Sequence, residues 1–279
     1  MRLFVTGATG FIGSHFVNRA HAAGHDLICL RRPGSNCRVP LGKQPRWLDG
    51  SLEDDWGDAL TDCDAVVHLA AHSANVPYDT LANCLRWNLT APLILFDRAR
   101  DVGVTRFVVA GTGFEYGTSG ERYESIPTDA PLLPTMTYPA SKAAAAIAFG
   151  QWTIEHGVRL QYLRIFQVFG LGEAESRLWP SLKRAALAGE DFSLTAGEQI
   201  RDFTPVADVV ETLLAAVERS DRVSEGKPEF RHVGTGKPQS LRSFVEYWWD
   251  HWGASGQLHF GAKPYRQNEV MRYVPEIEV

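Results

Sequence analysis

Short apolar runs alternate with helical stretches through the first 170 residues of the chain. Residues 2–5 and 26–30 are apolar runs, and between them a helix is expected to begin near Phe11, with apolar side chains at helical spacing. The same alternation continues with strands expected at 65–69, 106–110 and 159–166 and helices at 81–100 and 139–156. Strands that alternate with helices predict βαβ units and a parallel sheet.

The later part of the chain lacks this regular alternation of strands and helices. Prolines at 180, 205, 228, 238 and 264 divide it into short pieces. The sequence therefore predicts an α/β fold with a Rossmann-type doubly wound parallel sheet and a smaller C-terminal lobe that closes over the sheet edge where such folds bind ligands.

Composition narrows the class of protein without changing this fold. The chain has 279 residues, of which 44% are hydrophobic and 22% charged, and its net charge is −5. An acidic balance argues against a nucleic-acid binder with a basic face. The four cysteines have no metal-ligand spacing, and no apolar run is long enough to cross a bilayer. The chain enters its first strand at once, without a signal peptide, so we expect a cytoplasmic protein that binds no metal.

A glycine-rich turn separates the first strand from the first helix. The segment TGATGFIG at 6–13 supplies glycines for a tight turn, for close approach of the backbone to a pyrophosphate, and for close helix–sheet packing. The N-terminus of the helix adds free N–H groups and a partial positive charge. We expect a dinucleotide cofactor to contact Gly7, Thr9, Gly10, Phe11, Ile12 and Gly13.

Two arginines end the second strand. In a dinucleotide fold this position meets the adenosine ribose, where an acidic residue bonds the 2′-hydroxyl of NAD and an arginine accommodates the 2′-phosphate of NADP. Arg31 and Arg32 therefore favour NADP(H) over NAD, unless both are only solvated surface residues.

Tyr138 and Lys142 lie four residues apart at the start of a predicted helix, so they share one face. A nearby ammonium is expected to lower the pKa of the phenol and make it a usable acid or base. Thr112, after the strand at 106–110, carries a hydroxyl that is able to bond a substrate carbonyl together with the tyrosine.

These segments together resemble the extended short-chain dehydrogenase/reductase family, and within it the branch that acts on nucleotide sugars. The resemblance rests on the glycine turn, on GTGFEYG at 111–117 and on YPASK at 138–142. It continues through LRIFQVFG at 163–170, RDFTPVADVV at 201–210 and HVGTG at 232–236, so that it covers nearly the whole chain.

The resemblance implies a role for each matching residue. Thr112 would orient the carbonyl, Tyr138 would transfer the proton, and Lys142 would bond the nicotinamide ribose. Further cofactor contacts would come from Ser51, Leu52, Leu69, Ala70 and Ala71, although the family usually has an aspartate where Ser51 and Leu52 stand. The substrate contacts would be Thr112, His72, Gly113, Phe114, Gln167, Arg177, Arg201, Arg266 and Glu269.

Some of these contacts have simpler readings. The alternative for Arg201 is an ion pair with Asp202 or Asp208, and the alternative for Arg266 is a solvated tail residue. For His72 the alternative is a hydrogen-bonded pocket histidine.

The family comparison also implies how the chain is divided. Residues 1–165, joined by 203–235, would form the dinucleotide-binding Rossmann domain. Residues 166–202 and 236–279 would form the substrate-binding lobe.

Departures from the family narrow the expected reaction. The 4,6-dehydratases carry Asp-Glu directly after the threonine, whereas this chain has Gly113 and Phe114, and Glu115 one place later is expected to face away at strand-like spacing. We therefore expect an NADPH-dependent reductase of a nucleotide-linked keto-sugar, a 4-keto-6-deoxyhexose above all. The alternatives are an NAD-dependent nucleotide-sugar 4-epimerase and a non-catalytic NADP-sensing regulator. The resemblance also implies a homodimer formed through the helices at 81–100 and 139–156.

Overall fold

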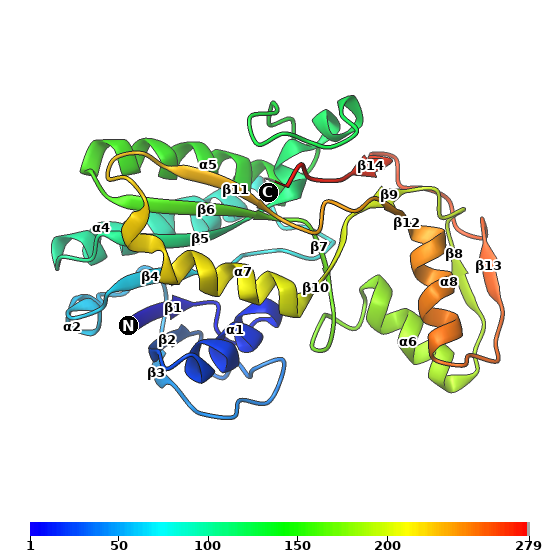
Figure 1. The fold of residues 1–279 in the computed structure, drawn as a ribbon, viewed down its shortest axis with the longest axis horizontal. Coiled ribbons are helices and arrows are strands. Elements are labelled where there is room, and N and C mark those ends of the chain that lie inside the picture. Colours follow the sequence, from blue (N-terminus) through cyan, green and yellow to red (C-terminus); the bar gives the residue numbers. More distant parts are fainter. Residues whose placement is uncertain (278–279) are drawn as a thin grey trace.

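Seven parallel strands form one sheet in the computed structural model, which describes residues 1–277 (Figure 1). Their spatial order is β11-β6-β5-β4-β1-β2-β3. They are β1 (Arg2–Thr6), β2 (Asp26–Arg31), β3 (Arg46–Asp49), β4 (Ala65–His68), β5 (Arg106–Thr112), β6 (Arg159–Ile165) and β11 (Glu229–Val233). The predicted Rossmann-type fold is confirmed, and the sheet also contains β3, which the apolar pattern did not reveal.

Helices cover both faces of this sheet, which is why its central strands are apolar on both sides. On one face α1 (Phe11–Ala22) packs beside α7 (Val206–Glu218), and their buried residues share a core with β1 and β4 (Figure 1). On the other face α2 (Gly57–Leu60), α4 (Ala91–Asp101) and α5 (Thr137–His156) enclose a second core. All four residues of β4 are buried between these two cores.

The expectation of one helix over 81–100 is wrong in detail. The segment forms α3 (Leu81–Leu85), a π-helical turn over Arg86–Thr90, and then α4. Pro92, near the start of α4, has no N–H to continue the hydrogen-bond ladder of a single α-helix. The wider turn accommodates that missing donor.

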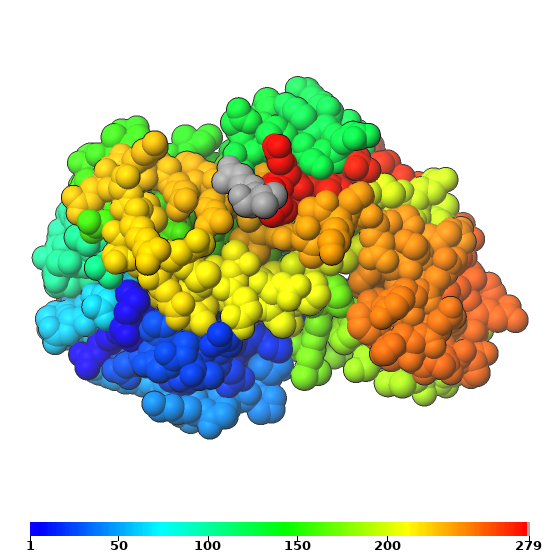
Figure 2. Space-filling model, in the orientation of Figure 1, coloured from blue at the N-terminus to red at the C-terminus, as the bar shows by residue number. Residues whose placement is uncertain are grey.

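The later segments form a separate group of elements beside the sheet domain. Helices α6 (Leu178–Ala188) and α8 (Leu241–His251) pack together with the strand pair β8 (Phe192–Leu194) and β13 (Leu258–Phe260) around a small apolar core. Figure 2 shows this lobe, yellow-green and orange, on one side of the blue-to-green sheet domain.

Short strands connect the lobe to the sheet domain. The pair β7 (Gln167–Phe169) and β10 (Phe203–Pro205) is parallel. A second group joins β9 (Ile200–Arg201) to β12 (Gln239–Ser240) and β14 (Arg272–Tyr273). Within residues 1–277 no helix is long and apolar enough to span a bilayer, and no His, Cys, Asp and Glu side chains gather as a metal-binding group.

Candidate active site

The chain crosses over between β1 and β4, and the carboxyl ends of these two neighbouring strands form the point where open α/β sheets bind ligands. Gly7 follows β1 with φ +74°, and a Cβ there would lie 2.5 Å from the Ala70 nitrogen. The turn after β1 therefore packs directly on the residues that follow β4. Leu69 and Ala70 are half-buried beside it, and Ala71 is exposed.

Helix α1 begins at this turn with an open N-terminus. Gly10 is its N-cap, no side chain caps it, and its first turn holds no acidic residue. A Cβ at Gly13 would lie 2.0 Å from the Gly7 oxygen, so the helix contacts the turn closely. Such a cradle of free backbone N–H groups fits a dinucleotide pyrophosphate. Thr9 and Phe11 are half-buried in the loop and first turn, and Ile12 packs on the core.

Arg31 lies at the end of β2, as predicted, but its guanidinium is already engaged. Its Nε donates to Asp49 Oδ1 at 2.8 Å, and its Cζ lies 4.7 Å from the centre of the Trp47 ring. Asp49 ends the neighbouring strand β3 in register with Arg31. Arg32 is exposed to solvent. Asp49 was not among the predicted site residues, because β3 itself was not predicted.

Ser51 and Leu52 follow β3 in a compact turn. The Ser51 hydroxyl accepts the Glu53 N–H at 3.2 Å, and Leu52 packs against the second core. Both residues are half-buried.

Thr112, Tyr138 and Lys142 come together at the end of β5 and the start of α5; we refer to them as the trio. Thr112 is the last residue of β5, and Tyr138 and Lys142 occupy successive turns of α5. All three are buried, with Lys142 only 1% exposed. The Lys142 ammonium donates to the Ala110 carbonyl at 2.8 Å, which fixes it beside β5.

The low pKa expected for Tyr138 is not found in this structure. Burial raises the pKa of Tyr138, and the negative charge of Glu115 raises it further. Burial also lowers the pKa of Lys142 to about 8. Tyr138 is therefore a neutral phenol at neutral pH, in the form that donates a proton.

Glu115 occupies a place that the sequence did not predict. The segment Gly113–Tyr116 is a 3₁₀ turn rather than a strand, and it carries Glu115 into the interior, where it is 0% exposed. Its carboxylate accepts from the Thr112 N–H at 2.8 Å and from Arg164 Nε at 2.8 Å. The only signal in the sequence was an acid between the aromatic residues Phe114 and Tyr116.

A narrow pocket opens beside the trio. It is lined by Thr112, Gly113, Phe114, Ile165, Phe166, Gln167, Arg201 and Tyr273. Most of these residues were predicted substrate contacts, and the structure brings them together although they are far apart in sequence.

Arg201 pairs with neither Asp202 nor Asp208. It donates to Glu269 Oε1 at 2.7 Å and to the Val270 carbonyl at 2.7 Å, and it lies over the Tyr273 ring. Arg201 and Glu269 were both predicted substrate contacts, and they form one buried ion pair.

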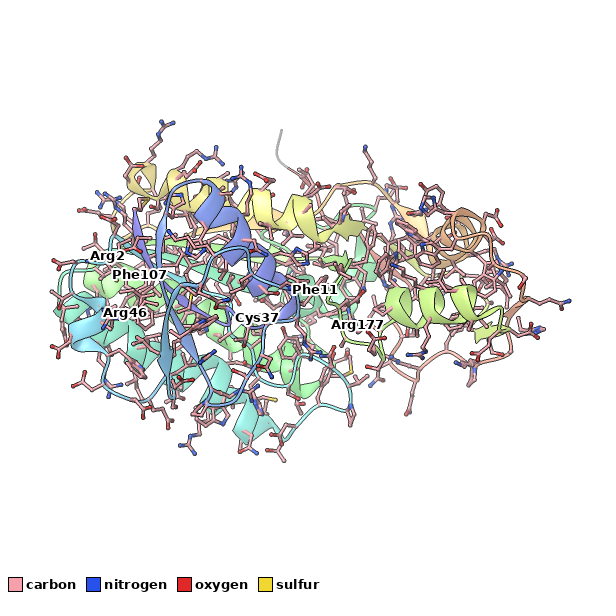
Figure 3. The ribbon with its side chains drawn as sticks, turned by 90° about the horizontal axis from the view of Figure 1, so that it is seen from below. Arg2, Phe11, Cys37, Arg46, Phe107 and Arg177 are labelled. Carbon is pink, nitrogen blue, oxygen red and sulfur yellow. The ribbon has the colours of Figure 1, made fainter. Side chains whose placement is uncertain are left out.

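The remaining predicted contacts surround Tyr78, which the sequence did not single out. Its ring lies 5.5 Å from that of Tyr138, and the charges of Arg177 and Arg266 oppose the effect of burial, which raises the pKa of Tyr78. Arg177 donates to the buried Glu173 at 3.2 Å, and Arg266 is exposed. Figure 3 shows Arg177 where the sheet domain meets the lobe.

His72 lies after β4 and is oriented by an acidic neighbour. Its Nε2 lies 2.8 Å from Asp79 Oδ2, and its backbone N–H donates to Asn88. The side chain is a hydrogen-bonded histidine that is 30% exposed near the trio.

Comparison with known proteins agrees with this architecture. A UDP-glucose 4-epimerase from Corynebacterium glutamicum is 26% identical, over 88% of this chain and 79% of that protein. A dTDP-4-dehydro-6-deoxy-D-allose reductase from a Streptomyces species is 28% identical, over 77% of this chain and 72% of its own length. The solved structure of MoeE5 in complex with UDP-glucose and NAD is 28% identical and superposes with a TM-score of 0.82, covering 99% of this chain and 90% of MoeE5.

The model of the NAD dependent epimerase/dehydratase family matches residues 3–230, which is most of the chain. These three relatives are an epimerase, a reductase and a protein solved in complex with UDP-glucose and NAD. The chain belongs to the NAD dependent epimerase/dehydratase family.

Proposed function

We propose that the protein is an NADPH-dependent reductase of a nucleotide-linked keto-sugar, with a 4-keto-6-deoxyhexose as its substrate. The observation that carries this proposal is a buried, neutral Tyr138 phenol at the start of α5, together with a narrow pocket that Thr112 lines at the end of β5. A phenol that keeps its proton is suited to protonate a carbonyl oxygen. The 28% identical allose reductase supports the same chemistry.

Different residues of the chain bind the cofactor, orient the carbonyl group and transfer the proton. The glycine turn, α1, Leu69, Ala70 and Ala71 hold the cofactor, which supplies the hydride when bound. The Thr112 hydroxyl donates a hydrogen bond to the carbonyl oxygen, and Tyr138 gives that oxygen its proton as the carbonyl carbon is reduced to an alcohol. Lys142 bonds the nicotinamide ribose. Its positive charge stabilises the tyrosinate that forms on Tyr138.

The lobe formed by residues 166–202 and 236–279 would hold the nucleotide-sugar. Gln167, Phe114, Gly113 and Arg201 line the pocket beside Thr112, and Arg201 is paired with Glu269. Arg177, Arg266 and His72 would contact the substrate from the surrounding segments. Arginine is well matched to diphosphate, because its fork bonds two oxygens at once.

Dehydration is a poor fit to this pocket. Gly113 stands where the dehydratases carry an acid, and a Cβ there would lie 2.9 Å from the Phe166 ring. Phe114 stands where they carry a second acid and has no proton to exchange. The chain therefore lacks the acid and base that loss of water requires.

Epimerisation is the second candidate, because the trio serves it equally. In that reaction the hydride returns to the opposite face of the same sugar carbon. The 26% identical UDP-glucose 4-epimerase and the carboxylate of Asp49 beside Arg31 favour it, since a carboxylate near the ribose suits NAD. A non-catalytic NADP sensor is less well supported, because a sensor has no use for the buried proton donor.

The proposed reaction is tested by mixing the protein with NADPH and a panel of nucleotide-linked 4-keto-6-deoxyhexoses. We expect one mole of NADPH to be oxidised per mole of one substrate. Tyr138→Phe is the matched variant and should lower kcat at least about a hundredfold, because the proton donor is lost, while nucleotide binding remains. Absence of NADPH oxidation across the panel, with bound NAD released on denaturation, would favour the epimerase.

The arginines at the end of β2 make a separate prediction about cofactor preference. Arg31→Ala with Arg32→Ala should weaken NADPH binding at least about tenfold more than NADH binding, because charged hydrogen bonds to the 2′-phosphate are lost. Fluorescence titration with each cofactor measures the two constants.

Arg46→Ala is the control for the arginine pair, since it removes one positive charge at the other end of β3 (Figure 3). Arg46→Ala should change the binding constants of NADPH and NADH by the same factor. Equal losses for NADPH and NADH in the Arg31/Arg32 variant would contradict the phosphate assignment.

We also propose that two copies of the chain associate through α3–α4 and α5. Ile147 and Ile154 on α5 are 67% and 56% exposed, and Leu81 on α3 is 45% exposed, so these helices present aliphatic side chains to a partner. Sedimentation should therefore give the mass of a dimer, and Ile147→Glu with Ile154→Glu should give a monomer. A wild-type monomer would refute the proposal.

A further inference from the structure

Glu115 is a fully buried acid that the reaction above does not use. It lies in the 3₁₀ turn directly after Thr112, and its two oxygens accept from Thr112 N–H, Tyr162 O–H and Arg164 Nε–H, each at 2.8 Å. The Thr112 N–H and the Arg164 guanidinium are donors only, and the positive charge of Arg164 favours a carboxylate over a carboxylic acid at Glu115. Burying a charged carboxylate costs desolvation free energy, and Glu115 is nevertheless buried next to the trio.

The first consequence concerns Thr112. The Glu115 carboxylate holds the Thr112 backbone N–H, while the Thr112 hydroxyl accepts the Phe114 N–H at 3.3 Å. Because the hydroxyl accepts in that contact, its own hydrogen stays free. The turn thus fixes Thr112 in the orientation where its hydroxyl is able to donate to a carbonyl oxygen.

The second consequence concerns charge. On α5, the negative charge of Glu115 raises the pKa of Tyr138, and it raises the pKa of Lys142 against the effect of burial. On β6, Arg164 and Tyr162 face Glu115 directly. Tyr116, on its own turn, bonds both Arg164 and the β11 residue His232.

Other titratable groups reach the trio from further elements. On β4, His68 faces Lys142 and stays neutral, with its pKa lowered to about 3 by burial. Tyr138 also faces Tyr78, Arg177 and Cys84. Of these groups, Glu115 is the only acid that acts on both Tyr138 and Lys142.

We propose that Glu115 is a positioning residue for the trio: its carboxylate fixes Thr112 and places one buried negative charge beneath Lys142 and Tyr138. That charge keeps Lys142 an ammonium and Tyr138 a neutral phenol. A neutral phenol beside an ammonium is ready to give a proton, whereas abstraction from an alcohol needs the tyrosinate. Glu115 therefore favours the protonation state of the trio that reduction of a carbonyl requires, an inference that rests on the proposed function.

The protonation of Lys142 is measurable without cofactor or substrate. We expect NMR of the protein with isotope-labelled lysine, assigned with Lys142→Arg, to give a pKa of about 8 for Lys142. In Glu115→Gln this pKa should fall by about one unit or more, because the opposing charge is gone. The alkaline limb of kcat/KM should move to lower pH by the same amount, and kcat should fall at least about tenfold while KM changes little.

Two further variants separate this role from simple loss of stability. Glu115→Gln with Arg164→Met removes both buried charges together and so leaves no unpaired guanidinium. The Lys142 titration is measured in this double variant if the single variant does not fold. Asp202→Asn removes an equally buried carboxylate, held by Thr235 and Gly236, without touching the trio. It should lower Tm and leave the Lys142 titration unchanged.

An unchanged Lys142 pKa in a folded Glu115 variant overturns the proposal. The titration uses the protein without cofactor, so its result does not depend on whether the protein is a reductase. Failure of the substrate panel alone would instead count against the proposed function.

Discussion

The site depends on one close approach, between the turn after β1 and the backbone that follows β4. Gly7 is in the left-handed region, and any Cβ there would collide with Leu69 and Ala70. This contact sets the N-terminus of α1 at the carboxyl edge of the sheet. The same edge carries Thr112 at the end of β5, so a cofactor held by α1 has the trio beside it.

The burial of charged side chains at this edge affects their electrostatic interactions as much as their geometry does. Lys142, Glu115 and Arg164 are all charged groups with little or no exposure, and each is held by hydrogen bonds to the others or to the backbone. Removing one partner from a buried ion pair costs about 3–5 kcal/mol, because the other charge is left unpaired. The low dielectric also strengthens the effect of Glu115 on its neighbours.

The sequence predicted the sheet domain well because its strands are buried on both faces and its helices have a clear apolar stripe. It also brought together Thr112, Tyr138 and Lys142 by their motifs. It did not predict β3, and with it the Asp49 partner of Arg31, because Arg46–Asp49 has only two apolar residues, which lie between two charged ones. Glu115 was misplaced because a 3₁₀ turn and a strand direct the same residue differently. The Arg201–Glu269 pair links segments that no local pattern connects.

The central claim is that hydride passes from the cofactor to the sugar and stays there. The most direct measurement uses NADPH that carries deuterium at the transferable position, with mass spectrometry of the sugar product. The account predicts one deuterium in the product for each NADP⁺ formed. A sugar inverted at one carbon, with no deuterium and no net oxidation of cofactor, would contradict it.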